Sequence, residues 1–293
     1  MKVAIYGQYY KIEDRHYVEE LFSTFESNGI DFFIENNYYQ ELKKFIKVTS
    51  PKTFKTHLDL NDSFNFMITI GGDGTILRAV TFIRNSNIPI VGINTGRLGF
   101  LATVQKEEIS HVVQLLISNH FLIRERTMLS VITTPKIKKL EEFNFALNEV
   151  SVSRKNTASM ITIETFIDDE YLTSYWADGL IIATPTGSTG YSLSCGGPII
   201  IPKSKSFAIT PIAPHNLNAR PLVIPEDTTI KLIVNGREDE FFLSLDSRII
   251  SLKNGTEILI KKSDFKLKMV QINHQTFIKT LREKLLWGQD TRN

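Results

Sequence analysis

The sequence has little cysteine and no long apolar run. Cys195 is the single cysteine among 293 residues, which excludes an internal disulfide, a CxxC redox pair and a thiolate zinc cage. No stretch approaches the roughly 18 consecutive apolar residues of a membrane-spanning helix. The apolar run Val3–Tyr6 is too short for the core of a signal peptide. We therefore expect a cytoplasmic protein that does not interact with a membrane.

The chain also lacks an excess of charge of either sign. It has 34 Lys and Arg against 32 Asp and Glu, a formal net charge of +2. A dedicated nucleic-acid binder would show a strongly basic domain or stripe, so no nucleic-acid partner is expected. Any anion that the protein binds must be held by local groups. The length favours two domains.

Several well-known catalytic motifs are missing. There is no G-x-x-x-x-G-K-[ST] and no H-R-D or D-F-G triplet, which excludes a P-loop enzyme and a protein kinase. The dinucleotide fingerprint fails because Leu77 stands where its third glycine is required, and this argues against a Rossmann dehydrogenase. Thr186 occupies the first glycine position of a G-x-S-x-G elbow, which disfavours a serine hydrolase. H-E-x-x-H is absent as well.

The first hundred residues alternate strand and helix patterns. Helical apolar spacing covers Val18, Leu21, Phe22 and Phe25, a weaker helix spans about 38–48, and a third begins near Ile76. Strands are expected at 3–7, 31–35, 65–70 and 89–94. Alternating strands and helices predict a parallel sheet with crossover helices. We therefore expect an α/β N-terminal domain.

The pattern changes after Phe100. One amphipathic helix follows near 109–116, and short β-branched runs then fill 121–272, which predicts a β-rich, sandwich-like domain. Asn254-Gly255 between two strand patterns predicts a hairpin over 250–260. The tail 275–287 is helical and is expected to pack back on the first domain. The predicted domains are 1–103, with 274–293 returning to it, and 104–273.

The segment ITIGGDGTILRA, residues 68–79, carries the strongest chemical signal. Gly71, Gly72 and Gly74 end a strand and open a helix, where successive backbone N–H groups can surround phosphate oxygens. Thr75 can cap the helix or donate to a phosphate. Asp73 is a carboxylate among anion-binding glycines, and removal of a hydroxyl proton is the natural use for it. Gly-Asp-Gly is also ordinary turn chemistry, with Asp as a helix cap.

Three more segments could bind a ligand. In NTGRLGFL, residues 94–101, Arg97 is either a phosphate clamp or a solvated loop residue. Asn148 and Glu149 interrupt a strand pattern and could recognise adenine edges or ribose hydroxyls, or be structural. The segment 177–200 combines Asp178 with many small hydroxyl residues, glycines and one aromatic, which suits close approach to a polar ligand with a stackable ring. A plain hydroxyl-rich loop is the alternative.

Together these segments resemble the NAD kinases. GGDGT at 71–75, NTGRLGF at 94–100, NE at 148–149 and DGLIIATPTGSTGYSLSCGGP at 178–198 match that family in order and spacing. The tail TLREKLLWG at 280–288 resembles its bacterial members. GGDGT alone is shared with lipid kinases of the diacylglycerol and sphingosine type. The NE pair and the TPTGST-x-Y run select NAD kinase.

The resemblance implies a reaction and its residues. The γ-phosphoryl group of ATP would pass to the 2′-hydroxyl of the adenosine ribose of NAD, giving NADP, with Asp73 as general base. Gly71, Gly72, Gly74, Thr75 and Arg78 would form the phosphate loop. The NAD site would comprise Asp73, Gly74, Asn148, Glu149, Asp178, Thr189, Gly190, Tyr191, Ser192, Leu193, Ser194 and Ala213. Gly190 departs from the alanine that is common after GST in the family.

The resemblance also implies cofactors and assembly. Mg²⁺ or another divalent cation would be bound mainly through the ATP phosphates, since Mg²⁺ keeps waters and needs few protein carboxylates, and no protein metal site is expected. Polyphosphate could replace ATP. Family members are homo-oligomers, so a homodimer or homotetramer is expected, with some residues serving a neighbour's ligand.

Two other functions remain open on sequence grounds. A lipid kinase would use the same GGDGT loop but would need an apolar groove and would have no use for Asn148, Glu149 or Asp178. A dinucleotide sensor would bind NAD or NADP without turnover. Replacing Asp73 with Asn separates an enzyme from a sensor.

Overall fold

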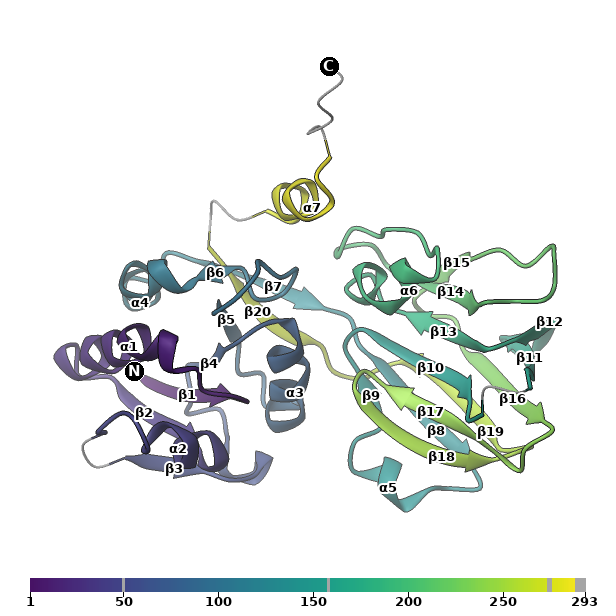
Figure 1. The fold of residues 1–293 in the computed structure, drawn as a ribbon, viewed down its shortest axis with the longest axis horizontal. Coiled ribbons are helices and arrows are strands. Elements are labelled where there is room, and N and C mark those ends of the chain that lie inside the picture. Colours follow the sequence, from purple (N-terminus) through teal and green to yellow (C-terminus); the bar gives the residue numbers. More distant parts are fainter. Residues whose placement is uncertain (49–50, 157–158, 273–275, 288–293) are drawn as a thin grey trace. The chain divides into compact units, whose positions relative to one another are not determined.

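The computed structural model describes residues 1–48, 51–156, 159–272 and 276–287. Its contacts divide the chain into two compact units, Met1–Glu125 with Leu267–Asn293 and Arg126–Lys266 (Figure 1). Among the described residues, no helix has both the length and the apolar character needed to cross a membrane.

Unit 1 is built on an eight-stranded sheet. Its strand order is β3-β2-β1-β4-β5-β20-β7, with β6 paired to β5. The strands are β1 (Lys2–Gly7), β2 (Asp31–Glu35), β3 (Lys52–Phe54), β4 (Phe66–Ile70), β5 (Ile90–Asn94), β6 (Val104–Gln105), β7 (Leu122–Arg126) and β20 (Leu267–Gln271). Every residue of β4 and β5 is buried, as expected of central strands in a parallel sheet.

The helices of unit 1 connect or flank these strands. The α-helices are α1 (Arg15–Ser27), α2 (Asn36–Leu42), α3 (Asp73–Ile83), α4 (Ile109–Ile117) and α7 (Phe277–Leu285), and short 3₁₀ turns span Ile12–Asp14, His57–Asp59 and Lys106–Glu108. The α1 residues Val18, Leu21, Phe22 and Phe25 are buried. The strand–helix alternation read from the sequence is therefore confirmed. The helix expected over 38–48 is shorter, and β3 was not predicted.

The strand order of unit 1 reverses direction between β1 and β4. From β1 the chain moves to β2 and β3, whereas from β4 it moves to β5 on the other side, and the pairings β1–β2, β1–β4 and β4–β5 are parallel. In such sheets ligands bind outside the carboxyl ends of the strands at this switch point. Gly7 and Gly71 stand at that edge.

Unit 2 consists of two six-stranded sheets. One has the order β15-β14-β13-β10-β17-β18 and the other β12-β11-β16-β19-β8-β9. The strands are β8 (Leu129–Thr134), β9 (Phe145–Ala146), β10 (Glu149–Arg154), β11 (Ile161–Ile167), β12 (Glu170–Ala177), β13 (Gly179–Ala183), β14 (Ser206–Ile212), β15 (Leu222–Pro225), β16 (Ile230–Gly236), β17 (Glu240–Leu245), β18 (Arg248–Lys253) and β19 (Glu257–Lys262); the helices are α5 (Lys138–Glu141), a 3₁₀ turn at Gly187–Thr189 and α6 (Tyr191–Ser194).

One hydrophobic core joins the two sheets of unit 2. It includes Val152, Ile182 and Phe241 from the first sheet and Ile163 and Leu232 from the second. Because alternate residues of each strand face this shared core, the unit is a sandwich. Together with the parallel sheet of unit 1, this confirms the predicted fold class.

The hairpin predicted over 250–260 is wrong. β18 pairs with β17 in one sheet, whereas β19 pairs with β16 and β8 in the other. Gly255 has φ +75°, but its N–H donates to the Val234 carbonyl, and the Asn254 N–H donates to the Asp239 carbonyl. The Asn-Gly turn is thus fixed by neighbouring strands and carries the chain from one sheet to the other.

The unit bounds differ from the boundaries expected at 103 and 273. The buried face of α4 belongs to the core of unit 1, and β20 pairs with β5, so both elements lie with the α/β unit. In α7 the Phe277 ring lies 6.1 Å from that of Phe100, and Leu281 is buried. Ile278 remains 53% exposed. Gln275, where the helix was expected to begin, lies outside the described residues.

Candidate functional site

The GGDGT loop joins β4 to α3 at the switch-point edge of unit 1. Gly71 has φ +146°, and a Cβ there would collide with the Thr75 side chain. The Thr75 N–H donates to the Gly72 carbonyl at 2.9 Å. A Cβ at Gly72 or Gly74 would meet no protein atom within 4 Å. The fold itself therefore requires Gly71, while Gly72 and Gly74 leave open space beside the start of a helix.

Asp73 connects this loop to the segment after β5. Its Oδ2 accepts a hydrogen bond from the Phe100 N–H at 2.8 Å, and its Oδ1 accepts from Leu101 and Ala102 at 3.0 and 2.9 Å. A Cβ on Gly99 would collide with the Asp73 carboxylate. The structure thus brings together two of the segments singled out in the sequence. Three of the four lone-pair positions of the carboxylate are used, which leaves one on Oδ2.

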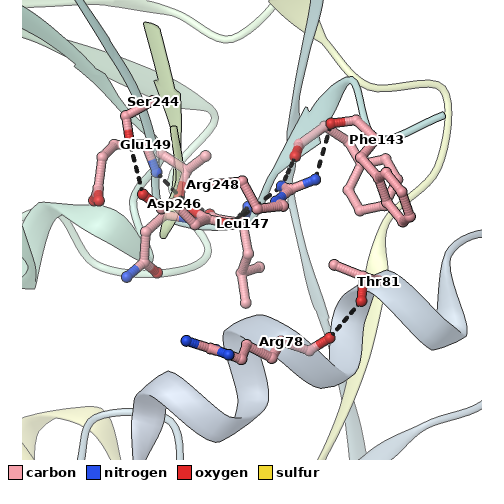
Figure 2. Close-up of polar contacts among 11 residues, drawn as sticks. Arg78, Thr81, Phe143, Leu147, Glu149, Ser244, Asp246 and Arg248 are labelled. Atoms are coloured by element: carbon pink, nitrogen blue, oxygen red, sulfur yellow. Dashed lines mark hydrogen bonds and ion pairs between the residues drawn. The ribbon is translucent and has the colours of Figure 1, made fainter. Parts of the chain in front are cut away.

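Arg78 lies one turn further along α3. With the Gln8 amide assigned by its hydrogen-bond network, the Gln8 oxygen accepts from Nε and Nη1 of Arg78. The Thr81 hydroxyl donates to the Arg78 carbonyl at 2.8 Å (Figure 2). Burial, and secondly the Glu35 carboxylate, raise the pKa of nearby Tyr6 to about 12. Gln8 follows β1, so both strands at the switch point contribute to this cluster.

Arg97 lies in a loop that the buried residue Asn94 holds. Its side chain is exposed, and its carbonyl accepts a hydrogen bond from the buried Asn94 side chain at 2.6 Å. Asn94 also accepts from the Gly96 N–H at 2.8 Å. The loop is therefore ordered by Asn94.

Asn148 and Glu149 lie where β10 begins in unit 2. The space for a Cβ on Gly190 is 3.3 Å from Glu149 Oε2 and 3.4 Å from Asn148 Nδ2, so both side chains reach toward the same glycine. The Thr184 hydroxyl donates to the Leu147 carbonyl at 2.6 Å, and its N–H donates to the Asn148 carbonyl at 2.8 Å. A Cβ on Gly187 would collide with the Asn148 backbone. The NE pair and the segment after β13 are thus in direct contact.

This pair carries polar atoms without partners. Asn148 Oδ1 and Glu149 Oε2 are both buried and accept no hydrogen bond within the described structure. Burial, and secondly the Asp246 carboxylate, raise the pKa of Glu149 to about 8. Buried polar groups without partners are rare, and these atoms are able to form hydrogen bonds with a ligand.

The remaining predicted residues of unit 2 differ in exposure. Asp178 forms an ion pair with Arg154 at 2.9 Å. Tyr191 on α6 is 47% exposed, and its pKa is raised by burial and then by the charges of Cys195, Asp178 and Glu149. Thr189, Gly190 and Leu193 are half-buried, and Ser194 is exposed.

Two predicted residues have structural features of their own. Ser192 is fully buried, and its hydroxyl is 2.8 Å from that of Thr210. Ala213 adopts a left-handed backbone conformation with φ +41°, which is uncommon for a residue with a Cβ.

Asp246 was missed by the sequence analysis. It lies in the turn between β17 and β18, and its carboxylate accepts hydrogen bonds from the backbone N–H groups of Leu147, Asn148 and Glu149 (Figure 2). An aspartate in a β-turn is ordinary turn chemistry, so nothing local marks it. Only the pairing of β10 with β17 shows which backbone N–H groups its carboxylate binds.

These features define a class. A glycine-rich loop at the start of a helix, at the switch point of a parallel sheet, with a carboxylate in the loop, is typical of an enzyme that handles nucleotide phosphates. Residues 3–121 match the ATP-NAD kinase N-terminal domain and residues 147–272 the ATP-NAD kinase C-terminal domain. The chain belongs to the NAD kinase family, and the reaction of that family is the ATP-dependent phosphorylation of NAD to NADP.

Individual relatives agree with this membership. A protein of Flavobacterium johnsoniae named NAD kinase is 57% identical, with all of both chains covered. The crystal structure of yeast NADH kinase complexed with NADH has a TM-score of 0.86 at 26% identity, covering 100% of this chain and 89% of the yeast chain. An NAD kinase from Archaeoglobus fulgidus in complex with ATP shares the fold, with a TM-score of 0.78 at 24% identity over 98% of this chain and 99% of the other.

Within the described residues, no group of three or more His, Cys, Asp or Glu side chains is arranged to hold a metal ion.

Proposed function

We propose that this chain transfers the γ-phosphoryl group of ATP to the 2′-hydroxyl of the adenosine ribose of NAD, with Asp73 as the general base. The 2′-oxygen attacks phosphorus, the bond between the γ-phosphorus and the β–γ bridging oxygen breaks, and ADP leaves. The hydroxyl proton passes to the Asp73 carboxylate. The products are NADP and ADP.

The observation that carries this proposal is the setting of Asp73. Three backbone N–H groups fix both oxygens of its carboxylate, and one lone-pair position of Oδ2 is left for a substrate hydroxyl. A general base must first lie in the correct orientation for proton transfer, and its pKa matters only after that condition is met. The three hydrogen bonds hold the Asp73 carboxylate in one orientation. A general base of this kind contributes about 10²- to 10⁴-fold to the rate.

The phosphates of ATP are assigned to the open side of the glycine loop. Gly72 and Gly74 have free space where a side chain would stand, and the first turn of α3 presents its N–H groups and the positive end of its dipole there. Arg78, oriented by Gln8, supplies a positive charge one turn along. Phosphoryl transfer depends mostly on such positioning and charge neutralisation.

The adenosine part of NAD is assigned to the Asn148–Glu149 pair. The pair offers an amide and a carboxyl group whose buried oxygens lack partners. With a pKa of about 8, Glu149 is roughly ten-to-one protonated at pH 7, so it can donate a hydrogen bond as well as accept one. Tyr191, Asp178 and Ala213 would line the rest of the site.

The metal, the assembly and the location complete the proposal. A divalent cation such as Mg²⁺ would be carried mainly by the ATP phosphates, where it neutralises charge during transfer. We further propose a homodimer or homotetramer, and a cytoplasmic location, which the single cysteine supports. Sedimentation of the purified chain measures the assembly.

The proposed reaction is tested by incubating the protein with NAD, ATP and Mg²⁺ and detecting NADP with an NADP-specific dehydrogenase. Robust NADP formation that disappears in Asp73→Asn, with NAD still bound, is the expected result. NAD binding without turnover with any phosphate donor would instead indicate a dinucleotide sensor. Neither turnover nor NAD binding would direct attention to lipid substrates.

A further inference from the structure

Asp246 carries no role in the reaction described so far, although its setting is unusual. Its side chain is 2% exposed and its backbone is left-handed, with φ +51°. Oδ1 accepts from the N–H groups of Asn148 and Glu149 at 2.8 and 3.1 Å, and Oδ2 accepts from that of Leu147 at 2.9 Å. In return, the Asp246 N–H donates to the Glu149 carbonyl at 3.0 Å. One buried residue thus holds the backbone of three consecutive residues, two of which form the NE pair.

The turn that carries Asp246 is itself held in place. The Ser244 hydroxyl donates to the Asp246 carbonyl at 2.9 Å. Arg248 lies 3.9 Å from Oδ2 and donates to the Phe143 carbonyl at 2.8 Å and to the Phe145 carbonyl (Figure 2). The carboxylate therefore cannot shift without disturbing contacts on both sides.

The buried carboxylate of Asp246 is hydrogen-bonded by the backbone around it. Burial raises the pKa of Asp246, against the three N–H groups that lower it, so the charged form is held at an energetic disadvantage. Burying a charge is costly unless it is paired and hydrogen-bonded, and the backbone N–H groups of residues 147–149 supply the hydrogen bonds. The arrangement gains something specific, which is a single fixed direction for residues 147–149.

We propose that Asp246 is a positioning residue for NAD. By accepting hydrogen bonds from the backbone N–H groups of residues 147–149, it orients the Asn148 and Glu149 side chains toward the adenosine. This inference rests on the proposed role of that pair in binding NAD. Asp246 touches no substrate in this account and acts through the loop that it holds. Residues that orient a binding group in this way affect function although they make no contact with the ligand.

The test is Asp246→Asn, with NAD binding measured by calorimetry and steady-state kinetics measured for both substrates. Asn tolerates a left-handed backbone as Asp does, so the turn is retained. Its amide oxygen keeps two of the three hydrogen bonds, and its NH₂ group then faces the buried Leu147 N–H. The unsatisfied N–H lowers stability, and the loosened segment no longer holds the Asn148 and Glu149 side chains in one direction. We therefore expect the Kd and KM for NAD to rise about 10-fold and the KM for ATP to stay within about twofold.

Asp168→Asn is the matched control. Asp168 is also an aspartate in a turn of unit 2, with φ +48°, and it accepts a hydrogen bond from the Thr229 N–H at 2.8 Å. It lies between β11 and β12 and, among the described residues, forms no hydrogen bond with residues 147–149. The control should leave the binding of both substrates unchanged. An equal loss of NAD affinity in Asp246→Asn and Asp168→Asn would refute a specific positioning role. So would a rise in the KM for ATP in Asp246→Asn as large as the rise in the KM for NAD.

A double-mutant cycle tests whether Asp246 acts through the pair. Glu149→Gln alone should weaken NAD binding, and adding Asp246→Asn should weaken it by less than the sum of the two single effects on the free-energy scale. Additive effects would overturn the inference and leave the proposed NAD site standing. If neither Glu149→Gln nor Asn148→Ala changes NAD binding, the proposed role of the pair is wrong, and the positioning role of Asp246 falls with it.

If Asp246→Asn does not fold, as judged by loss of a cooperative melting transition, Ser244→Ala takes its place. That change removes one hydrogen bond to the Asp246 carbonyl and leaves its carboxylate in place. A loosened turn should raise the Kd for NAD about two- to tenfold, with the KM for ATP unaffected. A Kd for NAD within experimental error of the wild type would count against the proposal.

Discussion

The sharpest prediction concerns Asp73→Asn, because the structure separates two consequences of this change. An Asn oxygen can accept two hydrogen bonds, whereas the NH₂ group that replaces the other oxygen can accept none. If the Asn oxygen takes the place of Oδ1, it keeps the Leu101 and Ala102 donors, and the Phe100 N–H loses its acceptor. The first consequence is therefore a loosened loop, and the second is the loss of the proposed base.

The two consequences have different magnitudes. One unsatisfied N–H costs about 1–3 kcal/mol of folding free energy, which lowers the melting temperature by roughly 2–10 °C for a domain of this size class. Loss of a general base lowers kcat by about 10²- to 10⁴-fold, equivalent to about 3–5 kcal/mol of transition-state stabilisation. A loosened loop alone would raise the KM values, whereas loss of the base lowers kcat with the KM values little changed.

The assay is NADP formation well below the melting temperature of the variant, with kcat and both KM values determined. Asp59→Asn is the control for loss of a loop carboxylate, since the Lys55 and Thr56 N–H groups both donate to Asp59 Oδ2, at 2.8 and 2.9 Å, and one amide oxygen can keep both bonds. The control should leave kcat unchanged and stability close to that of the wild type. If Asp73→Asn keeps kcat within about tenfold of the wild type, Asp73 is not the base. If its KM values rise in proportion to the loss of rate, the role of Asp73 is to hold the loop.

Three further predictions follow from the site. Gly187→Ala places a Cβ 2.7 Å from Asn148 Cα, so it should destabilise the fold by about 1–3 kcal/mol and weaken NAD binding. In Gly72→Ala the new Cβ meets no protein atom within 4 Å, so this variant should melt like the wild type but turn over ATP more slowly. Thermal melts and steady-state kinetics of the two variants check this prediction. Glu149 has a folded-state pKa of about 8 against an ordinary 4.5, so its favourable contribution to stability is complete below about pH 4.5 and is lost as the pH rises to about 8, by at most about 5 kcal/mol. Glu149→Gln should therefore gain in urea midpoint relative to the wild type between pH 5 and 8, and parallel curves would contradict the assigned burial. Removing divalent cations with EDTA should abolish NADP formation while leaving the melting temperature unchanged, and a large drop in melting temperature would instead indicate a structural metal.

The sequence predicted unit 1 well because its signals are local. The helical spacing of Val18, Leu21, Phe22 and Phe25 appears in the structure as one buried face of α1, and the apolar run before GGDGT is the buried strand β4. The sequence missed β3, because three residues at a sheet edge, two of them exposed, carry little pattern. It also placed the end of the second helix too late, since a weak apolar pattern does not mark where a helix ends.

The predictions failed where distant segments decide the structure. Asn254-Gly255 is a strong hairpin signal in isolation, yet the strands beside it pair with β17 on one side and with β16 and β8 on the other. The contact between the Ser192 hydroxyl and that of Thr210 in the interior also could not be read from the sequence, and the place of Ser192 in the ligand site stays a prediction. A residue's own neighbours in sequence do not show which strand it will face.

Asp73 and Asp246 show why part of the site is invisible in the sequence. Each carboxylate accepts from three consecutive backbone N–H groups, those of residues 100–102 and 147–149. Every residue except proline has a backbone N–H, so the donor segments need no particular side chains and leave no motif. Asp73 could be found in the sequence because the glycines beside it form a motif, whereas the position of Asp246 is set by strand pairing alone. It follows that most substitutions of Leu101 and Ala102 should preserve the hydrogen bonds to Asp73 if the new side chains fit sterically. Proline at either position should instead remove one N–H donor from Asp73 Oδ1 and lower kcat without any change to the carboxylate itself.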